Sequence, residues 1–306
     1  MNWQLLPQFA VSGLLAAGPI ALTALGLVLI FKSSYIFNFA QGQMLLMGTI
    51  FAWWFAVERG LPLWVAVLLA LLVAVVLGLL IERFALRPMT GQPLLSIVLM
   101  TLGLSQALQG AALLFFGGAQ QNFPQIFEAA NPYKITTPLL FNEKPILLIL
   151  KQNLVWSFVV AIVGVIIIGA FFQYTRTGLA MRATSEDHEL AQSIGLRIPR
   201  IFAISWALAG AVATTGGILL ATASGLDLSL SLAVLAAFPI VLLGGLESIP
   251  GTIVGGLLIG LAQGLVNVSK VSVIRSSAEI MPYVVLLIVL LIRPQGIFGQ
   301  KRIERV

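Results

Sequence analysis

The sequence has no cysteine, only one histidine and few charged residues, and each shortage excludes a class of protein. Without cysteine the chain forms no disulfide and carries no thiolate chemistry. One histidine, His188, is too few for the usual zinc-ligand sets when cysteine is absent. Only 9% of the 306 residues are charged and 59% are hydrophobic. A water-soluble domain of this size could not bury so many hydrophobic residues in one core. The solvent around the chain is therefore lipid.

Long apolar stretches separate the charged residues that are present. Two of them, 230–246 and 252–269, are short enough either to span the bilayer or to re-enter it. Seven others contain no Asp, Glu, Lys, Arg or His, and we expect each to cross about 30 Å of hydrocarbon as a helix: 9–31, 33–57, 61–81, 94–116, 153–173, 201–223 and 281–292. The sequence therefore predicts an all-α polytopic bundle, a single domain over residues 1–306 with about 8–9 transmembrane segments, some of them broken or re-entrant.

Basic residues predict the orientation of this bundle. Placing the N-terminus outside puts eleven of the 17 lysines and arginines in cytoplasmic segments and leaves six outside. Segment 117–152 then becomes an external loop, segment 174–200 the largest cytoplasmic loop, and the C-terminus is cytoplasmic. Membrane orientation therefore explains the net charge of +6 better than binding to nucleic acid does.

Small residues and prolines recur inside the apolar stretches. Two stripes at helical spacing, Ala209-Ala213-Gly217 and Gly256-Gly260-Gly264, predict close packing between helices. Gly18-Pro19 and Phe238-Pro239 predict kinked or broken helices, because proline removes a backbone hydrogen bond. A broken helix at membrane depth is buried in protein or lines a cavity.

The sequence lacks the residues needed for two kinds of energy coupling, proton coupling and direct binding of ATP. The seven long stretches hold no ionisable group that could change charge during a proton-coupled cycle, and we expect Glu247, in a Gly/Pro turn, to be interfacial. No phosphate-binding loop is present either. Gly264 to Lys270 has the length of one, but Ser269 and Val271 replace the required glycine and hydroxyl residue. If ATP drives the protein, another polypeptide binds it.

The cytoplasmic loop 174–200 predicts a short amphipathic helix. Thr184 or Ser185 is placed to cap it, acidic residues fill its first turn, and Gly195 is placed to end it. A helix of this kind either packs on the membrane surface or docks on a partner, and the residue pattern favours neither role.

The same loop resembles that of a known family. Its sequence is similar to the cytoplasmic loop of branched-chain amino-acid ABC permeases, where the pattern E-D-x-x-x-A-x-x-x-G forms the coupling helix that docks on the ATPase. Leu190 stands where the general importer pattern E-A-A-x-x-x-G has an alanine. The residues that the resemblance assigns to coupling are Arg182, Glu186, Asp187, Glu189, Ala191 and Gly195.

Four more segments match the family in order and spacing, so the resemblance covers nearly the whole chain. They are Asn38 to Gly42 beside Lys32, Glu82-Arg83 with Arg87-Pro88, Leu243 to Gly251, and Pro294 to Ile297. The third contains the expected cytoplasmic turn, with Gly244, Gly245, Glu247, Pro250 and Gly251. One departure is Gln41, which stands where many members have histidine, so a role that depends on an imidazole does not carry over.

The resemblance implies the shorter permease subunit of a bacterial inner-membrane importer. Its partners would be a second permease subunit, paralogous or identical, two ABC ATPase subunits and a periplasmic substrate-binding protein. ATP and Mg²⁺ would bind the ATPases, and this chain would hold no cofactor or metal and would not be an enzyme. The path for branched-chain or other apolar amino acids would involve Asn38, Gln41, Gln43, Gly18, Pro19 and Pro239, with helix ends freed at the prolines facing a charged group.

Two other functions stay open at this point. Close relatives with similar motifs carry urea or short amides, so the substrate class has an alternative. A secondary carrier that works alone would use the broken helices but lacks intramembrane charge. A membrane scaffold would use the glycine stripes, yet has no need for a capped cytoplasmic loop.

Overall fold

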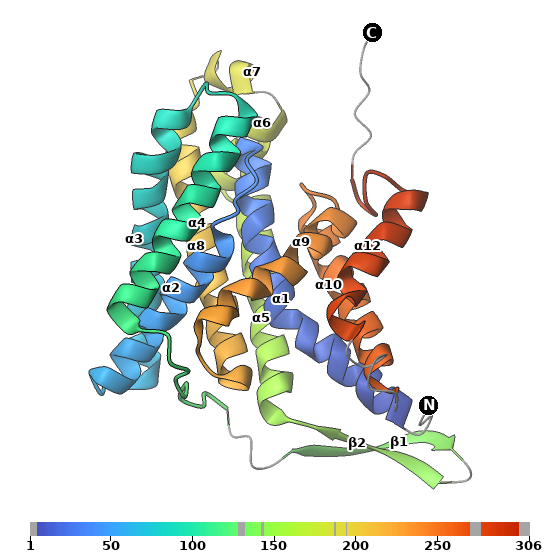
Figure 1. Cartoon of the computed structure of the whole chain (residues 1–306). Helices are drawn as coiled ribbons and strands as arrows, with labels where there is room; N and C mark the ends of the chain where they lie inside the picture. The colour runs from blue at the N-terminus through green and yellow to red at the C-terminus, as the bar shows by residue number, and fades with distance from the viewer. Residues whose placement is uncertain are drawn as a thin grey trace.

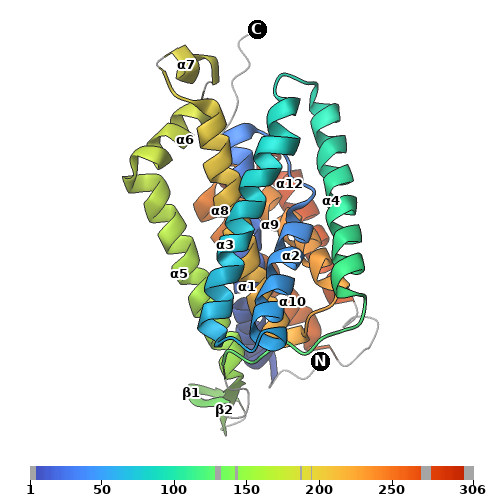
Figure 2. The ribbon, with the colours of Figure 1, turned by 90° about the vertical axis from the view of Figure 1, so that its left-hand side faces the viewer.

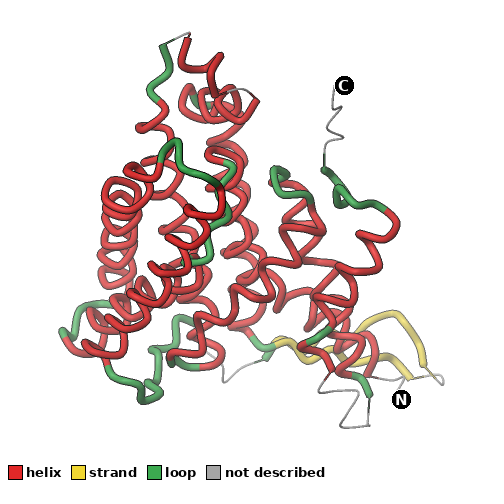
Figure 3. Tube along the Cα trace, turned by 45° about the horizontal axis from the view of Figure 1, so that its top comes forward, coloured by secondary structure: helices red, strands yellow, loops and turns green. Residues whose placement is uncertain are grey.

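The computed structural model describes residues 5–127, 132–141, 144–186, 188–193, 195–269 and 277–299, which form a bundle of helices with one β-hairpin (Figures 1 and 3). The helices are α1 (Leu6–Ser34), α2 (Gln41–Trp53), α3 (Leu63–Ile81), α4 (Leu94–Phe116), α5 (Gln152–Tyr174), α6 (Arg176–Glu186), α7 (His188–Ser193), α8 (Ile198–Ser224), α9 (Ala233–Gly244), α10 (Ile249–Asn267) and α12 (Met281–Ile292). Short π or 3-10 turns are Trp54–Glu58, Glu82–Leu86, Arg87–Met89, Leu228–Leu232 and Ser277–Glu279, and the strands are β1 (Tyr133–Phe141) and β2 (Lys144–Leu150).

Six helical segments are long and apolar enough to cross a membrane. They are Leu6–Ser34, Leu63–Met89, Leu94–Phe116, Gln152–Tyr174, Ile198–Ser224 and Ile249–Asn267. The stretch 281–292 forms a helix but is not as long as expected, because α12 has 12 residues and rises only about 18 Å, less than the roughly 30 Å of hydrocarbon. Of the two short stretches, α10 has the length of a span, whereas α9 has 12 residues and does not. The molecule is therefore a polytopic helical membrane protein that combines full-length and half-length helices.

The segment 117–152 contains structure that the all-α expectation missed. Strands β1 and β2 pair antiparallel there, with Tyr133 opposite Leu150 and Thr136 opposite Leu147. The Gln8 side chain on α1 bonds the outer edge of β2, accepting from the Ile149 N–H at 2.7 Å. The hairpin and the start of α1 lie at one end of the bundle, and α6, α7 and the α3–α4 connection lie at the other (Figures 1 and 2).

Helices α1 and α8 form the centre of the bundle. Helices α2, α3, α5 and α10 pack on them, and α4 packs on α2. In α1 and α8, 72% and 67% of the most apolar window is buried, against 28% in α3 and 17% in α4. Helix α3 faces α8 with a stripe of small residues: Ala66, Ala70, Ala74 and Gly78. Four of its leucines, Leu68, Leu72, Leu79 and Leu80, are exposed, as a lipid-facing surface requires.

The predicted glycine stripe packs α10 against α1. A Cβ built on Gly260 would lie 2.5 Å from both the Ala17 Cβ and the Gly13 carbonyl oxygen. One built on Gly264 would lie 2.3 Å from the Phe9 carbonyl oxygen. The other stripe also packs closely, since Gly217 meets Thr49 and Leu45 of α2. The packing interpretation of both stripes is therefore confirmed at these contacts.

We expect Gly260→Ala to lower the free energy of unfolding by about 1–3 kcal/mol, because the new methyl group forces α1 and α10 apart. Chemical unfolding of the purified chain in detergent measures this change. Gly169→Ala on α5 is the matched control, since nothing lies within 4 Å of its Cβ position and alanine favours the helix. Equal effects of the two substitutions would contradict the close α1–α10 contact.

Both membrane prolines lie inside helices that continue through them. Pro19 lies within α1, which changes direction partway along its length in Figure 1, and Pro239 lies within α9. The expectation of freed helix ends at these prolines was therefore wrong: a single proline removes one backbone bond, and packing on neighbouring helices keeps the rest of each helix intact. Both prolines are buried.

Candidate functional site

The predicted coupling segment forms the tip of the molecule at the end opposite the hairpin (Figure 2). It consists of α6 and the short helix α7. The expected cap at Thr184 or Ser185 was wrong, because both residues lie in the last turn of α6. Their hydroxyls donate back to the Ala180 and Arg182 carbonyl oxygens at 2.8 and 2.7 Å. This back-bonding satisfies each hydroxyl inside the helix, so neither is free to cap a new one.

Helix α7 presents one small buried residue and one large exposed residue. Ala191 is 2% exposed and packs against the bundle, whereas Leu190 is 62% exposed. Arg182 is half-buried and Glu186 is exposed at the end of α6. Asp187 and Ile194 lie outside the described residues, as does the Glu189 side chain. The small Ala191 side chain therefore packs α7 against the bundle, and the apolar Leu190 side chain faces outward.

Gly195 ends α7 as predicted. Its φ is +88°, and its N–H donates to the Gln192 carbonyl oxygen at 2.9 Å. Leu196 N–H then donates to the Ala191 carbonyl oxygen at 3.1 Å. Nothing lies within 4 Å of the Gly195 Cβ position, so the left-handed backbone and not close approach is the reason for glycine.

The Asn38 and Gln41 side chains are buried between α1 and α2, and each has a partner in the chain. Asn38 Oδ1 accepts from the Ala40 N–H at 3.0 Å, and Asn38 Nδ2 donates to Gln41 Oε1 at 3.1 Å. Gln41 Nε2 donates to the Ala209 carbonyl oxygen of α8 at 3.3 Å. These bonds give both residues a role in fixing the start of α2 against α8.

Gln43 differs from its two neighbours. The residue is 6% exposed, and its Oε1 has no hydrogen-bond partner within the described residues. A buried acceptor without a partner costs free energy, so such an atom is a position where a ligand or water is expected. Of the three polar residues predicted for the path, Gln43 is the one with an unused hydrogen-bonding atom.

The Gly/Pro turn between α9 and α10 is built by close backbone approach. A Cβ on Gly244 would lie 2.3 Å from the Gly251 carbonyl carbon, and Gly245 has φ +98°. Ser248 caps α10 by accepting from the Gly251 N–H at 3.0 Å. Pro250 follows in the first turn, where its missing N–H needs no partner. Glu247 is half-buried, and its backbone carbonyl oxygen accepts a hydrogen bond from Lys32 Nζ at 3.1 Å.

The C-terminal segment closes on this turn. The N–H groups of Ile297 and Phe298 donate to the carbonyl oxygens of Leu243 and Gly244 at 2.8 and 3.2 Å. The two segments singled out by the family resemblance, Leu243 to Gly251 and Pro294 to Ile297, therefore meet in space, although the bonded residues Leu243 and Ile297 are 54 positions apart.

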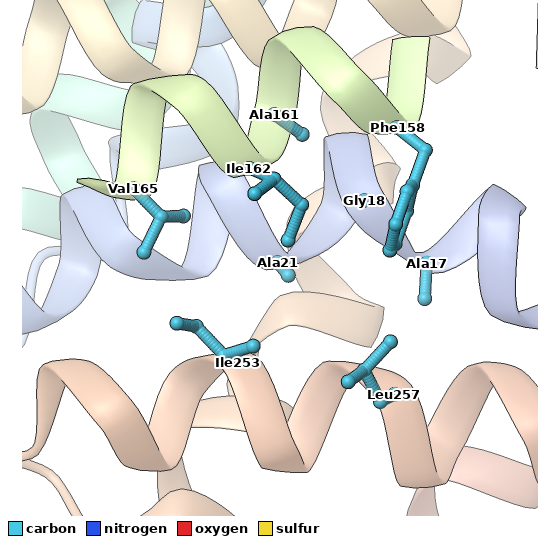
Figure 4. Close-up of a pocket in the computed structure, with 9 residues that line it drawn as sticks. All are labelled: Ala17, Gly18, Ala21, Phe158, Ala161, Ile162, Val165, Ile253 and Leu257. Carbon is cyan, nitrogen blue, oxygen red and sulfur yellow. The ribbon is translucent and has the colours of Figure 1, made fainter. Parts of the chain in front are cut away.

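Gly18 lies in a different environment from the amides. It lines an apolar hollow between α1, α5 and α10 with Ala17, Ala21, Phe158, Ala161, Ile162, Val165, Ile253 and Leu257 (Figure 4). A Cβ on Gly18 would lie 3.0 Å from the Phe158 Cα, so this glycine allows α5 to approach α1. The hollow offers no polar side chain for the charged ends of an amino acid.

Sequence reasoning missed one residue beside the site. Tyr35 ends α1 with φ +55° and is the one non-glycine residue with positive φ in the described ranges. Its hydroxyl donates to the Ser185 carbonyl oxygen in the last turn of α6. No sequence signal indicates this bond, because tyrosine rarely adopts the left-handed conformation and the two residues are 150 positions apart.

The similarity of this chain to known proteins extends over nearly its whole length. Residues 9–292 match the family model described as branched-chain amino acid transport system / permease component. The high-affinity branched-chain amino acid transport system permease protein LivH of Salmonella typhimurium is 27% identical and aligns with 98% of this chain and 97% of its own. The corresponding protein BraD of Pseudomonas aeruginosa is also 27% identical over the same shares.

One solved structure shares the fold. PsaBC from Streptococcus pneumoniae in complex with Fab has a TM-score of 0.51 and 14% identity, and the match covers 95% of this chain and 94% of that chain. At this identity the likeness is one of fold, and the arrangement of helices is therefore one that a natural protein adopts.

Proposed function

The chain belongs to the family of branched-chain amino acid transport permease components, and from this membership we propose that it forms part of the import path for branched-chain or other apolar amino acids. As the permease subunit of an ABC importer it is not itself an enzyme. The observation that carries the proposal is the family match over residues 9–292, which includes both the polar segment 38–43 and the coupling segment.

We propose a sidedness in which the N-terminus and the hairpin face outside and α7 faces the cytoplasm. The distribution of basic residues along the sequence supports it, since the segments predicted to be cytoplasmic hold eleven of the 17 lysines and arginines and the segments predicted to be external hold six. The partners would be a second permease, identical or paralogous, two ABC ATPases that bind ATP and Mg²⁺, and a periplasmic binding protein. The proposed location is a bacterial inner membrane.

The proposed coupling residues are those of the segment before and within α7. Leu190 supports the assignment, because an apolar side chain that is 62% exposed at the tip of the molecule suits a groove on a partner protein. The proposed path residues are Asn38, Gln41 and Gln43, with Gln43 supported most by its unpaired oxygen. Neutral amides suit a path that must release an amino acid as well as receive it. Gly18, Pro19 and Pro239 are proposed to shape the helices beside the path.

The test is transport by the complete complex in proteoliposomes. We expect ATP-dependent uptake of leucine, isoleucine or valine that requires the binding protein and stops when the ATPase subunits lose their phosphate-binding lysine. Uptake of urea or acetamide in place of the amino acids would move the chain to the amide branch of the family. Accumulation of solute by the purified chain alone would show a secondary carrier and overturn the proposal.

The same assay separates path residues from packing residues. We expect Gln43→Leu to reduce uptake with little loss of stability, because the lost oxygen has no partner among the described residues. Gln41→Ala should also lower the free energy of unfolding, by about 1 kcal/mol, because it loses the bond to Ala209. Uptake unchanged in Gln43→Leu, in a complex that assembles normally, would remove Gln43 from the path.

A further inference from the structure

The last turn of α1 is the point where three distant parts of the chain are tied together. Tyr35 terminates the helix in the left-handed region (φ +55°, ψ +19°), and its N–H still donates to the Phe31 carbonyl oxygen at 2.8 Å. A β-carbon makes this conformation unfavourable, so surrounding contacts must hold it. The Tyr35 ring meets the Phe31 ring edge-on at 5.7 Å between centroids.

Two side chains at this end of α1, those of Tyr35 and Lys32, bond to distant parts of the chain. The Tyr35 hydroxyl donates to the Ser185 carbonyl oxygen, one residue before the end of α6. Three positions earlier, Lys32 Nζ donates to the Glu247 carbonyl oxygen in the Gly/Pro turn at 3.1 Å. One helix end therefore holds both the coupling segment and the α9–α10 turn.

The chain that follows Tyr35 leads directly to the proposed path. Residues 35–40 are not helical and connect two buried helices. Phe37 and Phe39 form a cluster with Phe238 of α9, with centroid distances of 5.3, 5.1 and 5.7 Å among the three rings. All three rings are half-buried, and Asn38 between them bonds Gln41.

We propose that Tyr35 is a positioning residue that transmits movement of the coupling segment to the Phe37–Phe39–Phe238 cluster and to the Asn38–Gln41 pair; this rests on the proposed function. The hydroxyl bond joins the C-terminal turn of α6 to the first residue of the connecting segment. Because that segment is short and enters two packed helices, a shift of Tyr35 displaces Phe37 and Asn38 as well. Without the bond, α6 keeps its packing against α1, and we expect a shift of α6 to displace Phe37 and Asn38 less.

The first test is Tyr35→Phe in the reconstituted complex, since it removes one oxygen and keeps the ring on Phe31. We expect ATP hydrolysis to continue while the amino acid transported per ATP falls at least about fivefold. Tyr283→Phe is the matched control, because the Tyr283 hydroxyl also donates to a backbone carbonyl, that of Leu235 at 3.0 Å. Tyr283→Phe should keep the wild-type ratio. A wild-type ratio in Tyr35→Phe would overturn the proposal.

The second test restores the link covalently. Because the sequence has no cysteine, Tyr35→Cys combined with Ser185→Cys allows one defined cross-link with a short bifunctional thiol reagent. We expect the double variant to be uncoupled before cross-linking and recoupled at least about fivefold after it. No gain on cross-linking, or full coupling before it, would overturn the role of Tyr35. A wild-type complex that shows no substrate-stimulated ATP hydrolysis would instead refute the proposed function.

Discussion

Replacing Arg87 with methionine is expected to lower the free energy of unfolding by about 3 kcal/mol, the lower part of the range for breaking a buried ion pair. Arg87 Nε and Nη2 donate to the two oxygens of Glu82 at 3.1 and 2.8 Å. The Glu82 side chain is 2% exposed and the Arg87 side chain 39%, so the loss leaves a buried carboxylate without its partner. The exposure of Arg87 is the reason for choosing the lower value.

Two further variants test whether the pair is the cause. Arg83→Met removes a neighbouring arginine that is exposed, and we expect a change within about 0.5 kcal/mol. Glu82→Gln combined with Arg87→Met removes both charges and should recover much of the stability. Chemical unfolding in detergent measures all three proteins. Equal losses in Arg83→Met and Arg87→Met would show that the ion pair is not responsible.

Gly195→Leu is expected to leave membrane insertion intact and to reduce transport per ATP about tenfold or more. Leucine at φ +88° costs about 1–2 kcal/mol of backbone strain, which α7 avoids by ending elsewhere. Since space around the Cβ is open, the effect acts through the course of the chain from α7 to α8. Parallel assays of ATP hydrolysis and amino-acid uptake measure the coupling.

The control for this variant is a glycine with similar backbone and surroundings. Gly60 has φ +63°, and nothing lies within 4 Å of its Cβ position. It lies in the connection between α2 and α3, at the end of the molecule opposite α7 (Figure 1). Gly60→Leu should cost similar strain yet keep coupling. If Gly195→Leu couples as well as Gly60→Leu, the proposed docking role of α7 is refuted.

Long helices were the easiest elements to predict. The charge-free stretch 94–116 has the same bounds as α4, and 153–173 differs from α5 by one residue at each end. In lipid the backbone must satisfy its own hydrogen bonds, so a charge-free run of this length has little choice but a helix. The stretch 281–292 was predicted as a full-length span because it contains no charged residue, although its 12 residues are fewer than a span requires.

The candidate site was predicted as a set of segments and not as an arrangement. Gly195 ends its helix as the glycine at that position indicated, which is a local property. Thr184 and Ser185 looked like caps, yet α6 already includes them. The hairpin at 133–150 was not foreseen, because the whole of segment 117–152 was predicted as an external loop and each strand contains a proline, Pro138 or Pro145.

Local chemistry alone therefore establishes that this chain is a membrane protein, where several of its long helices lie along the sequence, and which loop carries the family's coupling pattern. Each of these follows from transfer of side chains and backbone into lipid, or from a short motif. Local chemistry did not show that the expected helix 33–57 is interrupted at residues 35–40. The contacts of Tyr35 with Ser185, Lys32 with Glu247 and Gln41 with Ala209 join residues 150, 215 and 168 positions apart. They exist because α1 and α8 pack at the centre of the bundle, and that order of packing depends on all the helices at once.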